Sequence, residues 1–235
     1  FWIVSLIKID SCFFLHASSR EGIQGIDLDW FSSIRSLQDR DDFLEFLKVA
    51  SPQWHQQGLS LSIPLHVGQV LPPWAYPLLD RIHLMVYDSP SIAPQGSHSI
   101  NDGNHQPRIE HGKRGLNYLL QSACPVEKIW MGIPFYGSKM DAPGMTMTFQ
   151  EAVEQRKGAH KPVSLENLEQ LLVGYQFDSL GVIREKLALV QQLGLGGVFI
   201  WELGQDSPPA TFLESITNMS QAILIPLDST TNAEL

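Results

Sequence analysis

The sequence predicts an α/β fold built on parallel strands. Short apolar runs alternate with helix-like stretches along the chain, which is typical of parallel βαβ units. Acidic and aromatic residues gather at the carboxyl ends of these runs, where active sites of barrels and open α/β sheets form. Only five such runs are visible. The fold is therefore either an open sheet or an eight-stranded barrel that lacks three strands before residue 20.

Each predicted strand is a short run rich in apolar residues. The first contains two aspartates, the second alternates polar and apolar residues, and the fourth ends at a glycine. The runs span 23–30, 59–67, 81–88, 128–137 and 196–203.

The predicted helices lie between and after these strands. The clearest opens at Asp178 and closes at Gly194, residue types that suit the two ends of a helix. Another carries acidic residues in its first turn and apolar residues at helical spacing. In chain order the predicted helices span 39–50, 75–80, 109–123, 178–194 and 209–219.

The composition narrows the class of protein. With 235 residues, 43% of them hydrophobic and 17% charged, the chain suits one packed domain. A net charge of −9 argues against nucleic-acid binding. No apolar run reaches the length of about 18 residues that a membrane helix needs. Two cysteines, Cys12 and Cys124, are too few for a disulfide framework, although one bridge stays possible.

The beginning of the sequence is unusual. Residues 1–18 contain no initiator methionine and no basic stretch, and they make a poor signal peptide. We expect the chain to begin within a longer protein, and this segment to add one strand to a sheet edge. The expected organisation is a segment of uncertain status at 1–18, the α/β domain at 19–217 and a tail at 218–235.

The strand around the two aspartates is the most informative stretch. Side chains alternate along a strand, so Asp27, Asp29 and Phe31 share one face. Carboxylates on an apolar strand indicate a functional site. The structural alternative is a buried aspartate that caps a loop or pairs with a basic group.

Four motifs together resemble glycoside hydrolase family 18, the chitinases and their relatives. "GIQGIDLDWF" (22–31) is similar to the family signature D-x-x-D-x-D-x-E, and "LMVYD" (84–88) is similar to its M-x-Y-D strand. "GIPFYG" (132–137) and "GLGGVFIWELGQD" (194–206) resemble the last two strands. The motifs occur in family order, and the resemblance covers about residues 20–217.

The resemblance implies a (β/α)8 barrel in which the aspartate strand is the fourth. Strands four to eight would then be present and the first three missing. The segment between Tyr136 and Gly196 is short for members that carry an extra α+β insertion, so we expect that insertion to be reduced or absent.

The resemblance also implies roles for the catalytic positions. In this family the N-acetyl oxygen of the substrate attacks the anomeric carbon while a glutamic acid protonates the leaving oxygen. Asp29 would orient the acetamido group, Asp27 would support Asp29, and Tyr87 would hydrogen-bond the acetamido oxygen.

Further positions would bind the sugar. Trp201 would stack beneath it, Asp88 would contact the sugar or its acetamido group, and Met85 and Tyr136 would line the cleft. The histidines, among them His66 and His83, lack metal-ligand spacing, and no metal or organic cofactor is expected.

The departures from the family pattern matter most for activity. Phe31 occupies the glutamic acid position, Gln24 replaces the first motif aspartate, and Ser138 stands where many relatives have arginine. Neither Glu21 nor Glu202 is placed to substitute. General acid catalysis contributes about 10²- to 10⁴-fold, and phenylalanine has no proton to give.

The sequence therefore predicts a chitinase-like protein that binds chitin or N-acetylglucosamine oligosaccharides without hydrolysing them. One alternative is an active hydrolase of the family; others are a truncated, non-functional product and an α/β interaction protein with no sugar site. The family resemblance alone suggests an extracellular or secretory location.

Overall fold

We describe the protein from a computed structural model. The structure describes residues 3–5, 24–29, 36–87, 108–139, 142, 144–155, 174–206, 213–214 and 216–218. The chain forms two compact units. The first comprises Phe1–Gly132 and Gly194–Phe199, and the second comprises Ile133–Leu193 and Ile200–Leu235.

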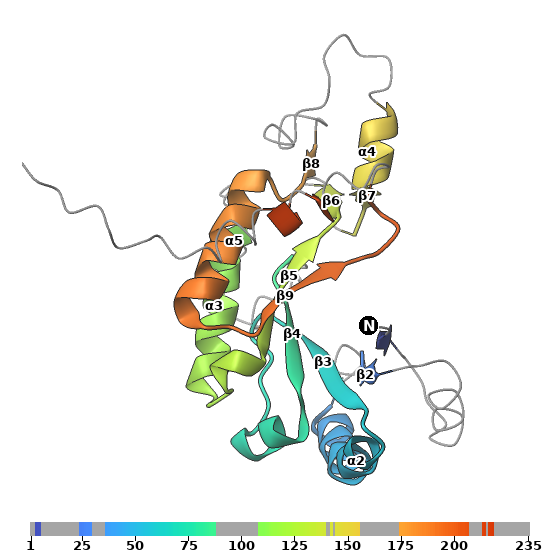
Figure 1. The fold of residues 1–235 in the computed structure, drawn as a ribbon, viewed down its shortest axis with the longest axis vertical. Helices are drawn as coiled ribbons and strands as arrows, with labels where there is room; N and C mark the ends of the chain where they lie inside the picture. Colours follow the sequence, from blue (N-terminus) through green and yellow to red (C-terminus); the bar gives the residue numbers. More distant parts are fainter. Residues whose placement is uncertain are drawn as a thin grey trace, which may run out of the picture. The chain divides into compact units, whose positions relative to one another are not determined.

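The main sheet has six strands in the order β1-β2-β3-β4-β5-β9 (Figure 1). The pairs from β1 to β5 are all parallel, as predicted. Gly196 N donates to Ile129 O, and Phe135 N donates to Trp201 O, so β9 also runs parallel to β5. The strands are β1 (Ile3–Ser5), β2 (Gly25–Asp27), β3 (Ser60–His66), β4 (Arg81–Met85), β5 (Ile129–Pro134) and β9 (Gly197–Trp201).

The amino-terminal segment adds the strand that the sequence suggested. Ile3 pairs with Gly25 and Ser5 pairs with Asp27, so β1 extends the sheet beyond the aspartate strand. In the described part of the chain, β1 and β9 stand at the two ends of the strand order. The barrel is therefore incomplete, with six strands that comprise the five predicted runs and the edge strand from the amino-terminal segment.

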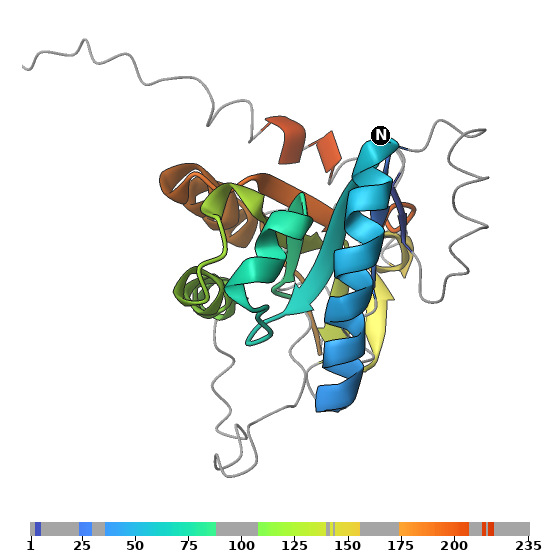
Figure 2. The same cartoon turned by 90° about the horizontal axis from the view of Figure 1, so that it is seen from below.

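Helix α2 (Leu37–Gln56) is longer than the predicted 39–50. Ser36 caps it by accepting a hydrogen bond from Asp39 N at 3.0 Å. The helix continues through Pro52 because Trp54, 3% exposed, is buried on the same side as Leu47. Figure 2 shows α2 running alongside β3.

Helices cover one face of the first unit's sheet. Leu61, Ile63 and Leu65 on β3 are fully buried. On α3 (Arg108–Gln121), a β-carbon at Gly115 would lie 2.9 Å from Val67 Cγ2 and 3.1 Å from Leu84 Cδ1. Leu84 therefore points toward α3. Alternation along β4 then directs His83 and Met85 to the opposite face.

Two 3₁₀ helices complete the described part of the first unit. They are η2 (Pro73–Leu78) and η3 (Val126–Lys128). A helix was predicted at 75–80, and η2 occupies most of that stretch as a tighter helix that contains two prolines.

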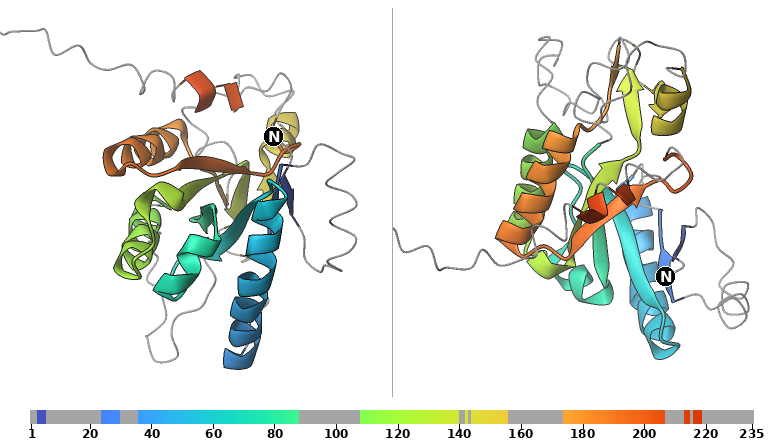
Figure 3. Two further views of the ribbon diagram at one scale, coloured as in Figure 1. Left: turned by 60° about the horizontal axis from the view of Figure 1, so that its bottom comes forward. Right: turned by 45° about the horizontal axis from the view of Figure 1, so that its top comes forward.

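The second unit carries a small antiparallel sheet with the order β7-β6-β8 (Figure 3). Helix α4 (Phe149–Gln155) packs against β7. The predicted strand at 128–137 is therefore two strands, β5 and β6, and β7, α4 and β8 follow in the segment after Tyr136. The strands are β6 (Tyr136–Lys139), β7 (Thr146–Thr148) and β8 (Tyr175–Gln176).

Helix α5 (Leu180–Leu193) confirms the best-predicted helix but begins differently. Ser179 Oγ, rather than Asp178, accepts a hydrogen bond from a first-turn amide, that of Val182. Asp178 instead pairs with Lys186 at 2.6 Å, and both side chains are fully buried. Gly194 follows the helix with a φ of +67°, a left-handed conformation that suits glycine. Of the predicted helix at 209–219, residues 213–214 and 216–218 are described and helical.

Candidate functional site

The functional side chains of the first unit lie on the sheet face opposite α3. Asp27 is the centre of this face. Its Oδ1 accepts a hydrogen bond from Ser62 Oγ at 2.5 Å and lies 3.0 Å from His83 Nδ1. All three side chains are nearly buried. A buried carboxylate requires such partners, because an unpaired charge away from water is costly.

Aromatic rings support this polar cluster. His83 stacks on Phe199 of β9 with ring centroids 4.6 Å apart, and Phe199 meets Tyr87 edge-on at 6.0 Å. A β-carbon at Gly132 would lie 2.4 Å from Tyr87 Cε1 and 2.9 Å from Phe199 Cζ. The glycine of "GIPFYG" therefore makes room for both rings.

The other expected residues of the first unit lie toward the carboxyl ends of their strands. Asp29 follows β2 and is half-buried. Met85 ends β4 and Tyr87 follows it, 9% and 5% exposed respectively. Phe31 and Asp88 lie outside the described residues. The structure thus places Asp27, His83 and Ser62 in contact, and brings Tyr87 and His83 to one aromatic ring, Phe199.

Two expected residues belong to the second unit. Tyr136 opens β6, is buried, and pairs with Thr148 of β7. Trp201 ends β9 and leaves 39% of its surface exposed. An exposed tryptophan side chain can in general stack on the apolar face of a sugar ring. Glu202 is exposed and accepts a hydrogen bond from Gln205 Nε2 at 2.9 Å.

Sequence reasoning missed several of these residues. It passed over Ser62, Gly132 and Phe199, and assigned His83 only a core or solvated role. A usable signal existed for His83, because it is a polar residue inside the apolar stretch 82–87. Ser62 gave no such signal, because its strand alternates polar and apolar residues. Their contact with Asp27 depends on the register between β2, β3 and β4.

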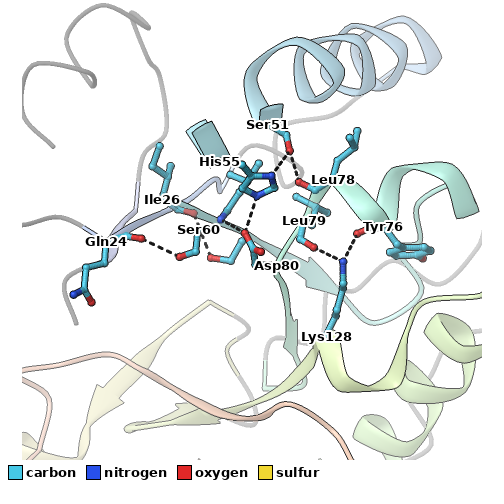
Figure 4. A network of polar contacts seen from close by, with 12 residues as sticks. Gln24, Ile26, Ser51, His55, Ser60, Tyr76, Leu78, Leu79, Asp80 and Lys128 are labelled. Atoms are coloured by element: carbon cyan, nitrogen blue, oxygen red, sulfur yellow. Dashed lines mark hydrogen bonds and ion pairs between the residues drawn. The ribbon is translucent and has the colours of Figure 1, made fainter. Parts of the chain in front are cut away.

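A serine, a histidine and an aspartate also line up at the opposite ends of the strands (Figure 4). His55 Nε2 lies 2.9 Å from Asp80 Oδ2, and Ser51 Oγ lies 3.5 Å from His55 Nδ1. Ser51 is buried, and its hydroxyl donates to Leu78 O at 2.6 Å. Because the Ser51 hydroxyl proton is donated to a carbonyl, it is not shared with His55 as a nucleophilic triad would require. The three residues instead link α2 to η2 and to the start of β4.

A lysine holds the neighbouring loop. Lys128 Nζ donates to Tyr76 O at 3.1 Å and to Leu79 O at 2.7 Å (Figure 4). Burial raises the pKa of Tyr76, whose hydroxyl contacts Ser122 Oγ. Burial also raises the pKa of the Cys124 thiol to about 12. These groups stabilise the core away from the carboxyl ends of the strands.

Within the described ranges, no group of three or more histidine, cysteine or acidic side chains could hold a metal ion. The helices found there are also too short or too polar to cross a membrane.

Residues 9–206 match the family model described as glycosyl hydrolases family 18. The chain belongs to this family. It is 23% identical to probable chitinase 10 of Drosophila melanogaster, over 79% of this chain and 10% of that protein. It is 24% identical to endochitinase 1 of Metarhizium robertsii, over 79% of this chain and 52% of that protein.

Solved family-18 chitinases share the fold. A Flavobacterium johnsoniae chitinase superposes with a TM-score of 0.67 at 22% identity, covering 91% of this chain and 64% of that one. A class V chitinase from Nicotiana tobaccum, in complex with NAG4, gives 0.66 at 19% identity, covering 93% and 80%.

These likenesses confirm the predicted α/β barrel class, incomplete in this chain, and identify a chitinase-like protein. The chain spans between a tenth and about half the length of these two relatives.

Proposed function

We propose that this chain binds chitin or N-acetylglucosamine oligosaccharides and does not hydrolyse them. The observation that carries the proposal is the difference between two positions of the aspartate motif, Asp27 and Phe31. Asp27 keeps two hydrogen-bonding neighbours, Ser62 and His83, whereas position 31 has phenylalanine in place of the family's glutamic acid. The support for an acetamido group would remain, and the proton for the leaving oxygen would be missing.

The family positions would share the work of binding. Asp29 and Tyr87 would hydrogen-bond the acetamido group, and Asp27 would hold Asp29 in place. Met85, Asp88 and Tyr136 would line the cleft, and Trp201 would stack against a pyranose ring. The Nicotiana tobaccum relative bound to NAG4 supports this class of ligand.

Without a general acid the glycosidic oxygen would have to leave as an alkoxide. A bound oligosaccharide could still place its N-acetyl oxygen near the anomeric carbon, but bond cleavage would lack about 10²- to 10⁴-fold of assistance. The active-hydrolase alternative is favoured by the names of the relatives, which are chitinases. It requires a proton donor other than residue 31.

Calorimetric titration with chitotetraose tests binding, and retention on chitin beads gives a second readout. We expect the unmodified chain to bind and Trp201→Ala to bind at least about tenfold more weakly, because a stacked aromatic anchor is lost. Trp74→Ala is the matched control, since Trp74 on η2 is also exposed, at 45%. Equal loss in both variants, or no binding by the unmodified chain, would contradict the proposal.

A further inference from the structure

His66 stands at the edge of the site and has no assigned role. It is the last residue of β3 and pairs in register with Met85, the last residue of β4. Both residues therefore lie at the carboxyl ends of adjacent parallel strands, where ligands of barrel proteins bind. His66 is half-buried.

The direction of the His66 side chain follows from its neighbours. Ser62 and His66 are four residues apart on one strand, so they share a face, and Ser62 Oγ contacts Asp27 on that face. Val67 packs on the other side, where its Cγ2 would lie 2.9 Å from a β-carbon at Gly115 of α3. The imidazole of His66 thus shares the face of Asp27, His83 and Met85.

The ring of His66 has an unsatisfied nitrogen. Its Nδ1 is buried and has no hydrogen-bond partner among the described residues. The backbone at this point is well held, because His66 N donates to Gln69 Oε1 at 2.7 Å and Gln69 N donates to His66 O at 2.9 Å. A buried polar atom without a partner is rare in folded proteins and marks a place where a ligand or water would fit.

The contrast with His83 sharpens this point. His83 lies on the same face, but its Nδ1 is paired with Asp27 and its ring stacks on Phe199. The contacts of the His83 ring are therefore made within the protein. The Nδ1 atom of His66, by contrast, has no such partner within the described part of the chain.

We propose that His66 hydrogen-bonds the bound oligosaccharide, directly or through one water molecule. This inference rests on the proposed function and adds a recognition residue that the four motifs do not contain. A neutral imidazole offers one donor and one acceptor, and sugar hydroxyl groups can serve both. Binding would supply the partner that Nδ1 lacks.

Calorimetric titration of the full chain with chitotetraose tests this inference. His66→Phe keeps a ring but removes both nitrogens, and we expect its Kd to rise about 3- to 10-fold, as for one lost hydrogen bond. His66→Gln retains a donor and an acceptor and should lose less. The matched control is His55→Gln, at the opposite ends of the strands, which should keep the Kd of the unmodified chain.

A second readout does not depend on the variants binding well. The side-chain ¹H–¹⁵N spectrum of the unmodified chain reports each histidine ring, and His66→Gln assigns the signal of residue 66. We expect this signal to shift on adding chitotetraose, whereas that of His55 should not. Thermal melts verify that each variant is folded.

The outcomes separate the two proposals. If the unmodified chain binds and both His66 variants keep its Kd, with no shift of the His66 signal, this inference is wrong and the proposed function stands. If the unmodified chain does not bind chitotetraose, the proposed function fails and this inference falls with it.

Discussion

His83 Nδ1 lies 3.0 Å from Asp27 Oδ1, and both side chains are about nine-tenths buried. The contact joins β2 to β4 across β3, whose Ser62 donates to the same carboxylate oxygen. Asp27 is thereby fixed two residues before Asp29. The partners of Asp27 thus come from β3 and β4, the two strands that follow β2 in the sheet.

Replacing His83 by phenylalanine tests this support. His83→Phe retains a ring to stack on Phe199 but leaves Asp27 with one fewer partner. We expect the free energy of unfolding to fall by about 1–3 kcal/mol, the usual cost of an unsatisfied buried group. Urea denaturation measures it. The double variant His83→Phe/Asp27→Leu should recover part of the loss, and full additivity of the two single changes would argue against coupling.

Gly132 should be intolerant of alanine. A β-carbon there would overlap Tyr87 Cε1 at 2.4 Å, so Gly132→Ala should destabilise the fold by about 1–3 kcal/mol through overpacking. Gly112→Ala on α3 is the matched control, because its β-carbon would meet nothing closer than 3.6 Å. Alanine within a helix should there be neutral or stabilise by up to about 1 kcal/mol. Similar melting temperatures for the two variants would refute this packing argument.

The buried pair Asp178–Lys186 should be sensitive to removal of one partner. Lys186→Met leaves a carboxylate in a site with no solvent exposure, and we expect a loss of about 3–5 kcal/mol. The double variant Asp178→Leu/Lys186→Met should be more stable than Lys186→Met alone, because it leaves no uncompensated charge. Chemical denaturation of the unmodified chain and the two variants measures these differences. A double variant less stable than Lys186→Met would contradict the prediction.

The Cys124 thiol should react slowly in the folded protein. Its pKa is raised by burial to about 12, so little thiolate exists near pH 8. In a Cys12→Ser background, a disulfide reagent should label Cys124 rapidly in urea and slowly without it. Equal labelling rates in both conditions would show that Cys124 is accessible.

The raised pKa of the Cys124 thiol also makes the free energy of unfolding decline as the pH rises from about 9 toward about 12. In this range the unfolded chain has lost the thiol proton while the folded chain still holds it.

Much of the fold was predictable because local patterns and parallel pairing agree. The strand predicted at 59–67 is β3 with one residue fewer at each end, and the strand predicted at 81–88 is β4, which ends three residues earlier at Met85. Helix α2 extends beyond the predicted 39–50 because the burial of Trp54 in the core outweighs the local cost of Pro52 within the helix. The β6–β8 sheet depends on pairing between distant residues such as Ser138 and Gln176, which no local pattern reveals.

The site was only partly predictable. The aspartates were visible as charged residues on an apolar strand. The partners of Asp27 come from two other strands, so finding them required the register of β2 with β3 and of β3 with β4. The unsatisfied nitrogen of His66 is a property of packing that the sequence does not display.

The central claim is that the chain binds its glycan without cleaving it because residue 31 is phenylalanine. The most direct measurement is hydrolysis of chitotetraose, whose leaving group is a sugar alkoxide that needs a proton donor, by the purified chain, its Asp29→Asn variant and its Phe31→Glu variant. We predict that the unmodified chain and Asp29→Asn form new reducing ends at the same background rate, while Phe31→Glu exceeds it. Turnover by the unmodified chain that Asp29→Asn abolishes would contradict the account.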